Sequence, residues 1–205
     1  MILYLTVIFI AMLIVSLFNI LFGLSLLQCE AWFVVVAVVC GVAFQFVVDG
    51  LFATLVHLFP KKWFSYDKKI FAVTKAERKF LNLFNVKKWK NLVWELGGLG
   101  GFKKSKIENP KDIGYVETFL MECNKGVVTH YIGMFAGYLL ILIFPIRFAL
   151  TVCLPIAFVN MVLNIMPIMV LRYNVPKLQV LHEALLKERF SKTLSSAKVE
   201  EHEIK

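Results

Sequence analysis

Two side chains beside one apolar stretch could perform acid–base chemistry: His130 and Glu122. They are eight residues apart, which on a helix separates them by about 12 Å along the axis and about 80° around it. They would not touch through one helix, but both could line one cleft, where a histidine can take a proton from a hydroxyl. We therefore predict His130 as a general base and Glu122 as the group that orients it. The alternative is an interfacial histidine that binds a lipid headgroup.

A second group of polar side chains lies in and after the last apolar stretch. Asn164 precedes Arg172 by two helical turns, and Tyr173 and Asn174 follow that arginine directly. Arginine binds phosphates and carboxylates through paired hydrogen bonds, so this group is predicted to hold a substrate. Two alternatives stay open: a buried asparagine that only bridges helices, and an arginine that only anchors a helix end.

Asp49 lies near the middle of another apolar stretch, with Gln45 one turn away on the same helical face. A carboxylate at that depth must be protonated, paired with another helix or exposed to a cavity. This feature also fits a transporter, so the sequence leaves the role of Asp49 open.

The elements that carry these residues are predicted to be membrane-spanning helices. The chain has 205 residues, of which 59% are hydrophobic and only 18% charged, with a mean hydropathy of +0.73. A run of about 20 apolar residues spans a bilayer, and continuous runs favour helices over strands. Four such runs are present: 2–27, 31–59, 127–144 and 148–171. The predicted fold is an all-α membrane protein, with a tight turn at Pro145 between the last two spans.

The charges predict the orientation of these spans. Of the 23 Lys and Arg residues, 14 lie between Lys61 and Lys111, and only Arg147 lies on the opposite side in a four-span arrangement. Lys and Arg concentrate in cytoplasmic loops, so both termini are predicted to be cytoplasmic. The net charge of +9 then reflects this bias and attraction to anionic lipids, and nucleic-acid binding is not expected.

The chain is predicted to have four parts. They are an N-terminal transmembrane hairpin (1–59), a cytoplasmic interfacial segment (60–126), a C-terminal transmembrane hairpin (127–171) and a cytoplasmic amphipathic tail (172–205) with a disordered end. In the second part aromatic residues alternate with lysines, as is typical of the membrane interface. There Thr74 and Glu77 form a capping box for a short helix, and a longer helix is predicted to start near Asp112 and to continue into the third span.

Several other classes of site are not indicated. The four cysteines are scattered singly, so neither a metal site nor a disulfide framework is predicted. The glycine-rich stretch 97–101 is not followed by Gly-Lys-Ser/Thr, and no G-x-S-x-G or H-E-x-x-H motif occurs. We predict no tightly bound cofactor.

Four blocks after position 84 carry a resemblance to a known family. They are Val86–Glu95, with its Trp-Lys pair; Gly97–Lys104, a glycine-rich turn ending in lysines; the helix from Glu117 through Glu122 to His130; and Asn164–Asn174, which reads Asn-x-x-Pro and then Arg-Tyr-Asn. In order and approximate spacing they resemble the glycosyl-4,4'-diaponeurosporenoate acyltransferases, which are small bacterial membrane proteins. The resemblance covers about residues 84–180. It departs from the family at Val93-Trp94, where Leu-Pro is expected, and at Val127, where a glutamate is expected.

The resemblance implies transfer of a fatty acyl chain to a hydroxyl of a glycosylated lipid, a terpenoid or carotenoid glycoside or another glycolipid, at the cytoplasmic face of a bacterial cytoplasmic membrane. It implies acyl-CoA or acyl carrier protein as donor, attracted by Lys87, Lys88, Lys90, Lys103 and Lys104. The substrate-binding residues that we predict are Arg172, Tyr173, Asn174, Asn164, Trp89, Lys90, Lys103, Glu95 and Glu117. The rival interpretations are a non-enzymatic scaffold or accessory subunit and, third, a small transporter. The sequence does not predict an oligomeric state.

Overall fold

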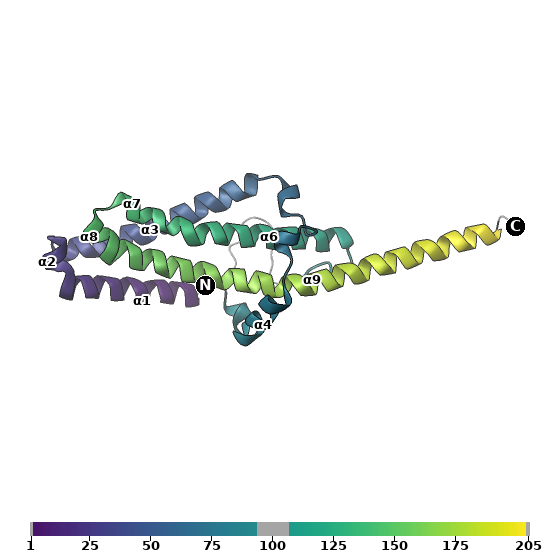
Figure 1. The fold of residues 1–205 in the computed structure, drawn as a ribbon, viewed down its shortest axis with the longest axis horizontal. Coiled ribbons are helices and arrows are strands. Elements are labelled where there is room, and N and C mark those ends of the chain that lie inside the picture. The colour runs from purple at the N-terminus through teal and green to yellow at the C-terminus, as the bar shows by residue number, and fades with distance from the viewer. Residues whose placement is uncertain (1, 94–106, 204–205) are drawn as a thin grey trace.

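The structure is a computed structural model that describes residues 2–93 and 107–203, and the elements in these residues are all helical (Figure 1). Four helical stretches are long and apolar enough to cross a membrane: Leu3–Leu27, Ala31–Leu58, Ile113–Ile143 and Ile146–Ser195. The prediction of an all-α protein with four candidate spans is therefore confirmed, and the first two spans agree with their predicted bounds to within a residue or two.

The N-terminal hairpin consists of two spans. The first comprises α1 (Ile2–Phe18), a π-helical turn η1 (Asn19–Gly23) and α2 (Leu24–Leu27). It ends at Gln28, whose φ of 55° lies in the left-handed region and reverses the chain. The second span is α3 (Ala31–Leu58).

The C-terminal half contains the two longest stretches. Asp112 caps α6 (Ile113–Ala136) by accepting hydrogen bonds from the backbone N–H groups of the first turn, which confirms the predicted start of this helix. It continues through η6 (Gly137–Leu139) and α7 (Leu140–Ile143) to a turn at Pro145. The last stretch comprises α8 (Ile146–Phe148), the π-helical η7 (Ala149–Cys153) and α9 (Leu154–Glu203). Helix α9 continues past Ser191, where the sequence predicted disorder, because good helix formers and the Glu188–Lys192 pair favour it there.

Span one is joined to span four at two carbonyls that prolines leave without a helical partner. Proline has no N–H, so Pro155 and Pro167 cannot bond the carbonyls four residues earlier. The carbonyl of Thr151 instead accepts from Asn19 Nδ2 at 2.9 Å, and that of Leu163 accepts from the Tyr4 hydroxyl at 3.3 Å. Unpaired backbone groups are costly in lipid, so these two bonds hold α1 against the last span.

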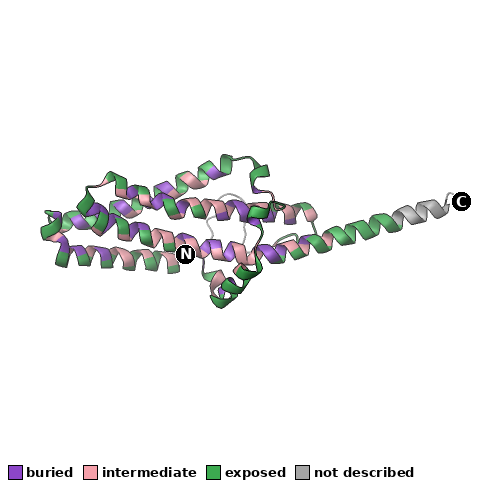
Figure 2. Cartoon of the chain, viewed as in Figure 1, coloured by how far each residue is buried: buried purple, intermediate pink, exposed green. Residues whose placement is uncertain are grey.

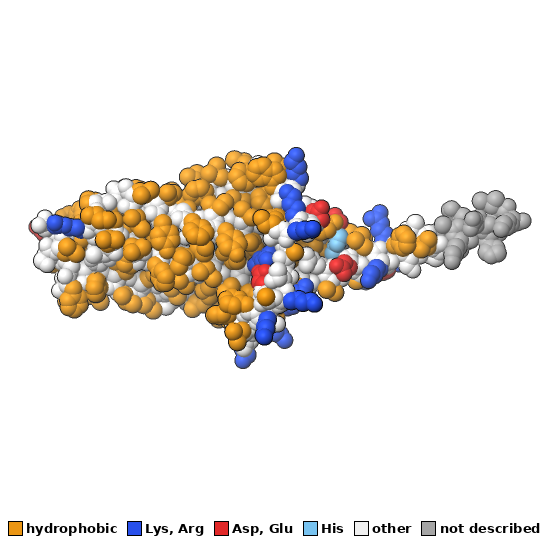
Figure 3. Space-filling model, viewed as in Figure 1, with side chains coloured by type: hydrophobic (Ala, Val, Ile, Leu, Met, Phe, Trp, Pro, Cys, Tyr) orange, Lys and Arg blue, Asp and Glu red, His pale blue; other side chains and the backbone are white. Residues whose placement is uncertain are grey.

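The segment between the hairpins contains short helices: η2 (Lys61–Phe64), η3 (Lys69–Phe71), α4 (Lys75–Leu83), α5 (Val86–Trp89) and η4 (Lys90–Leu92). Thr74 Oγ1 accepts from the Glu77 N–H at 3.2 Å, which confirms the predicted N-cap. Figure 3 shows that apolar side chains cover the bundle, whereas most Lys and Arg gather toward the end from which α9 projects.

The burial pattern is inverted relative to a soluble protein. Many large apolar side chains of the four spans are exposed, as expected for a lipid-facing surface (Figure 2). Among the described residues, the buried polar side chains are Asn19, Gln45, Asn124, Lys125, Asn164 and His182. Such groups are expensive inside a membrane protein, so they indicate where function is concentrated.

Candidate active site

A cavity of about 380 Å³ lies between the four spans, within the range of small-molecule sites. All four spans, together with Val93, contribute to its walls. Most of its lining is apolar, and the polar side chains that line it are Tyr4, Gln45, Asp49, His57, Thr129, His130, Asn160 and Asn164. From Ile156 to Leu171 it follows α9 for about 22 Å. The cavity thus suits a long apolar chain that carries a polar group.

His130 belongs to a chain of hydrogen bonds in this cavity. Its Nδ1 lies 2.9 Å from Asn164 Oδ1. The Asn164 amide nitrogen donates to Asp49 Oδ2 at 3.3 Å and to the Asn160 carbonyl at 3.1 Å, which orients the amide. Its oxygen can therefore only accept, so Nδ1 carries the proton and Nε2 is the basic nitrogen of the neutral ring. A histidine held in this tautomer is suited to take a proton from a hydroxyl.

Asn160 and Gly133 complete this chain. Asn160 Nδ2 donates to the Gly133 carbonyl at 3.2 Å and lies 3.5 Å from Asp49 Oδ1. A Cβ atom at Gly133 would lie 3.0 Å from Asn164 Oδ1 and 3.1 Å from Asp49 Oδ1. An alanine there would therefore require these polar groups to shift by a few tenths of an ångström.

A similar arrangement lies one turn further along the third span, at the start of η6. Gln45 Nε2 donates to the Gly137 carbonyl at 2.7 Å. A Cβ atom at Gly137 would lie 2.8 Å from Gln45 Oε1 and 2.9 Å from Asn160 Nδ2. The two glycines, four residues apart, thus form the floor on which amide groups from α3 and α9 meet.

The structure gives Glu122 a different position from the one we predicted. It forms an ion pair with Lys125 at 3.1 Å, and it lines a smaller pocket with Lys61 and Phe64 rather than the cavity of His130. Lys125 is three residues away on α6, where helical geometry brings side chains together, whereas His130 is two turns away. The groups in the orienting position are Asn164 and Asp49.

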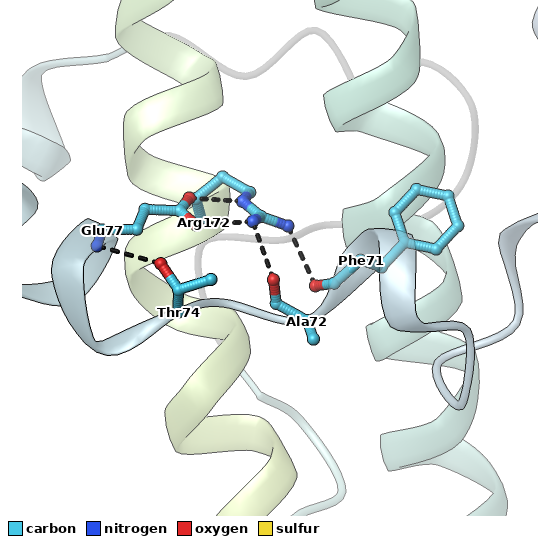
Figure 4. Close-up of polar contacts among 5 residues, drawn as sticks. All are labelled: Phe71, Ala72, Thr74, Glu77 and Arg172. Carbon is cyan, nitrogen blue, oxygen red and sulfur yellow. Dashed lines mark hydrogen bonds and ion pairs between the residues drawn. The ribbon is translucent and has the colours of Figure 1, made fainter.

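Arg172 also has a different set of neighbours (Figure 4). Its Nε and Nη2 each donate to a carboxylate oxygen of Glu77 at 2.6 Å. Nη1 donates to the Phe71 carbonyl at 2.9 Å and Nη2 to the Ala72 carbonyl at 3.1 Å. Arg172 thus attaches the segment between the hairpins to α9, next to Leu171 in the cavity wall.

The remaining predicted binding residues with described positions lie outside the cavity lining. Tyr173 packs in a cluster with Trp89, and Lys177 Nζ lies 3.9 Å from its ring centre. Asn174 is half-buried, and Lys90 begins η4. Glu95, Lys103 and Lys104 lie outside the described residues.

Glu117 joins two further side chains near the base of the projecting part of α9. It accepts from the Tyr66 hydroxyl at 3.2 Å and lies 3.0 Å from Nε2 of the buried His182. Burial, together with the Glu117 carboxylate, raises the pKa of the Tyr66 hydroxyl above its usual value, so this hydroxyl stays protonated and donates.

Sequence reasoning noted Asp49 and Gln45 but connected neither of them with His130. The signal that could have connected them is the pair Gly133 and Gly137 on the helix of the histidine. Small residues four apart mark a close approach between membrane helices, and His130 lies one turn before the first of them.

The sequence was compared with known proteins. The sequence model of a family described as glycosyl-4,4'-diaponeurosporenoate acyltransferase matches residues 60–184, which is more than half of the chain. Neither the comparison with curated proteins nor that with solved structures returned a match.

Proposed function

Because the chain belongs to the glycosyl-4,4'-diaponeurosporenoate acyltransferase family, we propose that it transfers a fatty acyl chain to a sugar hydroxyl of a glycosylated carotenoid or related lipid. Membership makes it an acyltransferase, and its four candidate spans make it a multi-pass membrane protein. The proposal adds the site of the reaction. The observation that carries it is the chain His130–Asn164–Asp49 inside an apolar cavity between the spans.

In the proposed reaction His130 Nε2 takes the proton of the acceptor hydroxyl. The hydroxyl oxygen attacks the carbonyl carbon of an acyl thioester, and a carbon–oxygen ester bond replaces the carbon–sulfur bond. The proton then passes from His130 to the departing thiolate. Asn164 and Asp49 hold the His130 ring in the required tautomer and orientation. The base is therefore in place before the acceptor hydroxyl binds, which accelerates the proton transfer.

The charge distribution supports the cytoplasmic face as the side of entry. On the face seen in Figure 3, Lys and Arg residues gather near the end of the bundle from which α9 projects. Lys87, Lys88 and Lys90 follow α4 in the segment that Arg172 attaches to α9. An anionic acyl-CoA or acyl carrier protein would be drawn to this surface, which is the side that the Lys/Arg bias assigns to the cytoplasm.

The test is lipid mass spectrometry of native-host cells that produce either the wild-type chain or His130→Ala at matched protein levels. We expect a lipid heavier by one fatty acyl residue with the wild type and its loss with His130→Ala. His182→Gln is the matched control, because it alters another buried histidine outside the cavity, and it should retain the product. If His130→Ala retains the product, the assignment of His130 as the base is refuted; if the wild-type chain yields no acylated lipid either, the proposed acyl transfer is refuted.

A further inference from the structure

Gln45 has a buried acceptor that no described residue satisfies. Its side chain belongs to the cavity wall, and the residue is 5% exposed. Its nitrogen is committed to the Gly137 carbonyl at 2.7 Å, which fixes the amide orientation. Its Oε1 has no hydrogen-bond partner among the described residues. A buried acceptor left unpaired costs about 1–3 kcal/mol, so the position is suited to a ligand that donates.

A ligand that extends from His130 into the bundle could supply this donor. His130 and Gly133 of α6 and Gly137 at the start of η6 follow one another along the third span, and the first and last are about 10 Å apart. Over this length Asn164, Asp49, Asn160 and Gln45 project onto the helix from α9 and α3. The set forms one polar track in an otherwise apolar cavity.

The track is rich in acceptors. Besides Gln45 Oε1 it presents the carboxylate oxygens of Asp49, one of which lies directly over Gly133. An acyl chain or a polyene carries no hydrogen-bond donor, whereas a sugar ring carries several hydroxyls. About 10 Å is long enough for one pyranose ring with hydroxyls at both ends.

We propose that the sugar ring of the acceptor lies along this track and that Gln45 Oε1 accepts a hydrogen bond from a second hydroxyl, different from the one that is acylated. Gln45 is then a specificity residue that favours glycosides over simple long-chain alcohols. A site that bonds a substrate hydroxyl discriminates strongly against analogues that lack it. This inference rests on the proposed function for the identity of the acceptor.

The test combines substrate analogues with variants of Gln45. Purified protein in nanodiscs is given an acyl thioester and a dodecyl glucoside, or analogues that each lack one ring hydroxyl. Acylation is measured by mass spectrometry, and binding by the shift in thermal unfolding temperature, also in His130→Ala. We expect one analogue to react roughly tenfold more slowly with the wild type. With Gln45→Met, the acylation rate of the parent glucoside should fall by a similar factor, whereas the rate with that analogue should not fall further.

Gln45→Glu provides the conservative control, because a protonated carboxyl can donate to Gly137 and still accept from the sugar. This variant should again acylate the parent glucoside faster than the analogue that lacks the hydroxyl. If all analogues react alike with the wild type, or if Gln45→Met slows every acceptor equally, the subsite is refuted while acyl transfer stands. If glucosides are bound with the predicted preference but never acylated, the proposed function fails and the subsite stands. If neither binding preference nor acylation occurs, both are refuted.

Discussion

The substitution Gly133→Ala adds one methyl group to the hydrogen-bond chain and removes no polar atom. Its Cβ would lie 3.0 Å from Asn164 Oδ1, the atom that accepts from His130, and 3.1 Å from Asp49 Oδ1. Both distances are shorter than ordinary contacts, so the polar groups must move by a few tenths of an ångström. A misplacement of about 1 Å at a reacting group costs roughly 100-fold in rate. The smaller displacement expected here should lower the rate of acyl transfer roughly three- to tenfold.

The effect on stability should be modest. Overpacking costs about 1–3 kcal/mol, and the exchange of glycine for alanine inside a helix returns about 1 kcal/mol. The free energy of unfolding should therefore fall by about 0–2 kcal/mol, measured by thermal unfolding in detergent beside the acylation assay. Gly114→Ala is the control on the same helix, because its Cβ would make only an ordinary 3.5 Å contact at an exposed position. Equal acylation rates for the two variants would refute the role of Asn164 in orienting His130.

Three further predictions concern contacts around the cavity. Asp49→Asn replaces an acceptor of Asn164 with a group that is half donor, so kcat should fall roughly tenfold. An unchanged kcat would make Asp49 structural. Arg172→Lys loses the paired hydrogen bonds to Glu77 and should destabilise the protein by about 3 kcal/mol. Proteolysis of the segment between the hairpins should then be faster, and an unaltered rate would show that Arg172 does not attach this segment to α9. Tyr4→Phe should lower the free energy of unfolding by about 1 kcal/mol, and by less in a Pro167→Ala background, where the N–H of residue 167 can bond the Leu163 carbonyl. Equal losses in both backgrounds would show that Tyr4 does not compensate for Pro167.

The spans could be predicted from the sequence because membrane insertion depends on length and apolar composition, which are local properties. The capping residues Thr74 and Asp112 were equally accessible, since a cap is decided within four residues. His130 stood out because an ionisable group beside lipid is costly.

The partners of these residues could not be predicted, because they depend on how helices pack. Helical spacing on α6 suggested Glu122 for His130, but the contact is made by Asn164 from α9. Arg172, followed by Tyr173 and Asn174, was predicted to bind a phosphate or carboxylate of a substrate. Its partner is instead Glu77, nearly a hundred residues earlier in the chain. Neither pairing leaves a periodic pattern in the chain, so only the three-dimensional arrangement reveals it.

The two bonds between span one and the proline-containing last span have an evolutionary consequence. Pro155 and Pro167 lie within the residues that match the family, whereas Asn19 and Tyr4 lie before them. A relative that lacks one of these prolines has no bare carbonyl to satisfy and is released from the need for the corresponding donor. We therefore expect each proline and its donor to be gained and lost together across relatives. Such covariation would show that the first span evolved together with the part of the chain that matches the family.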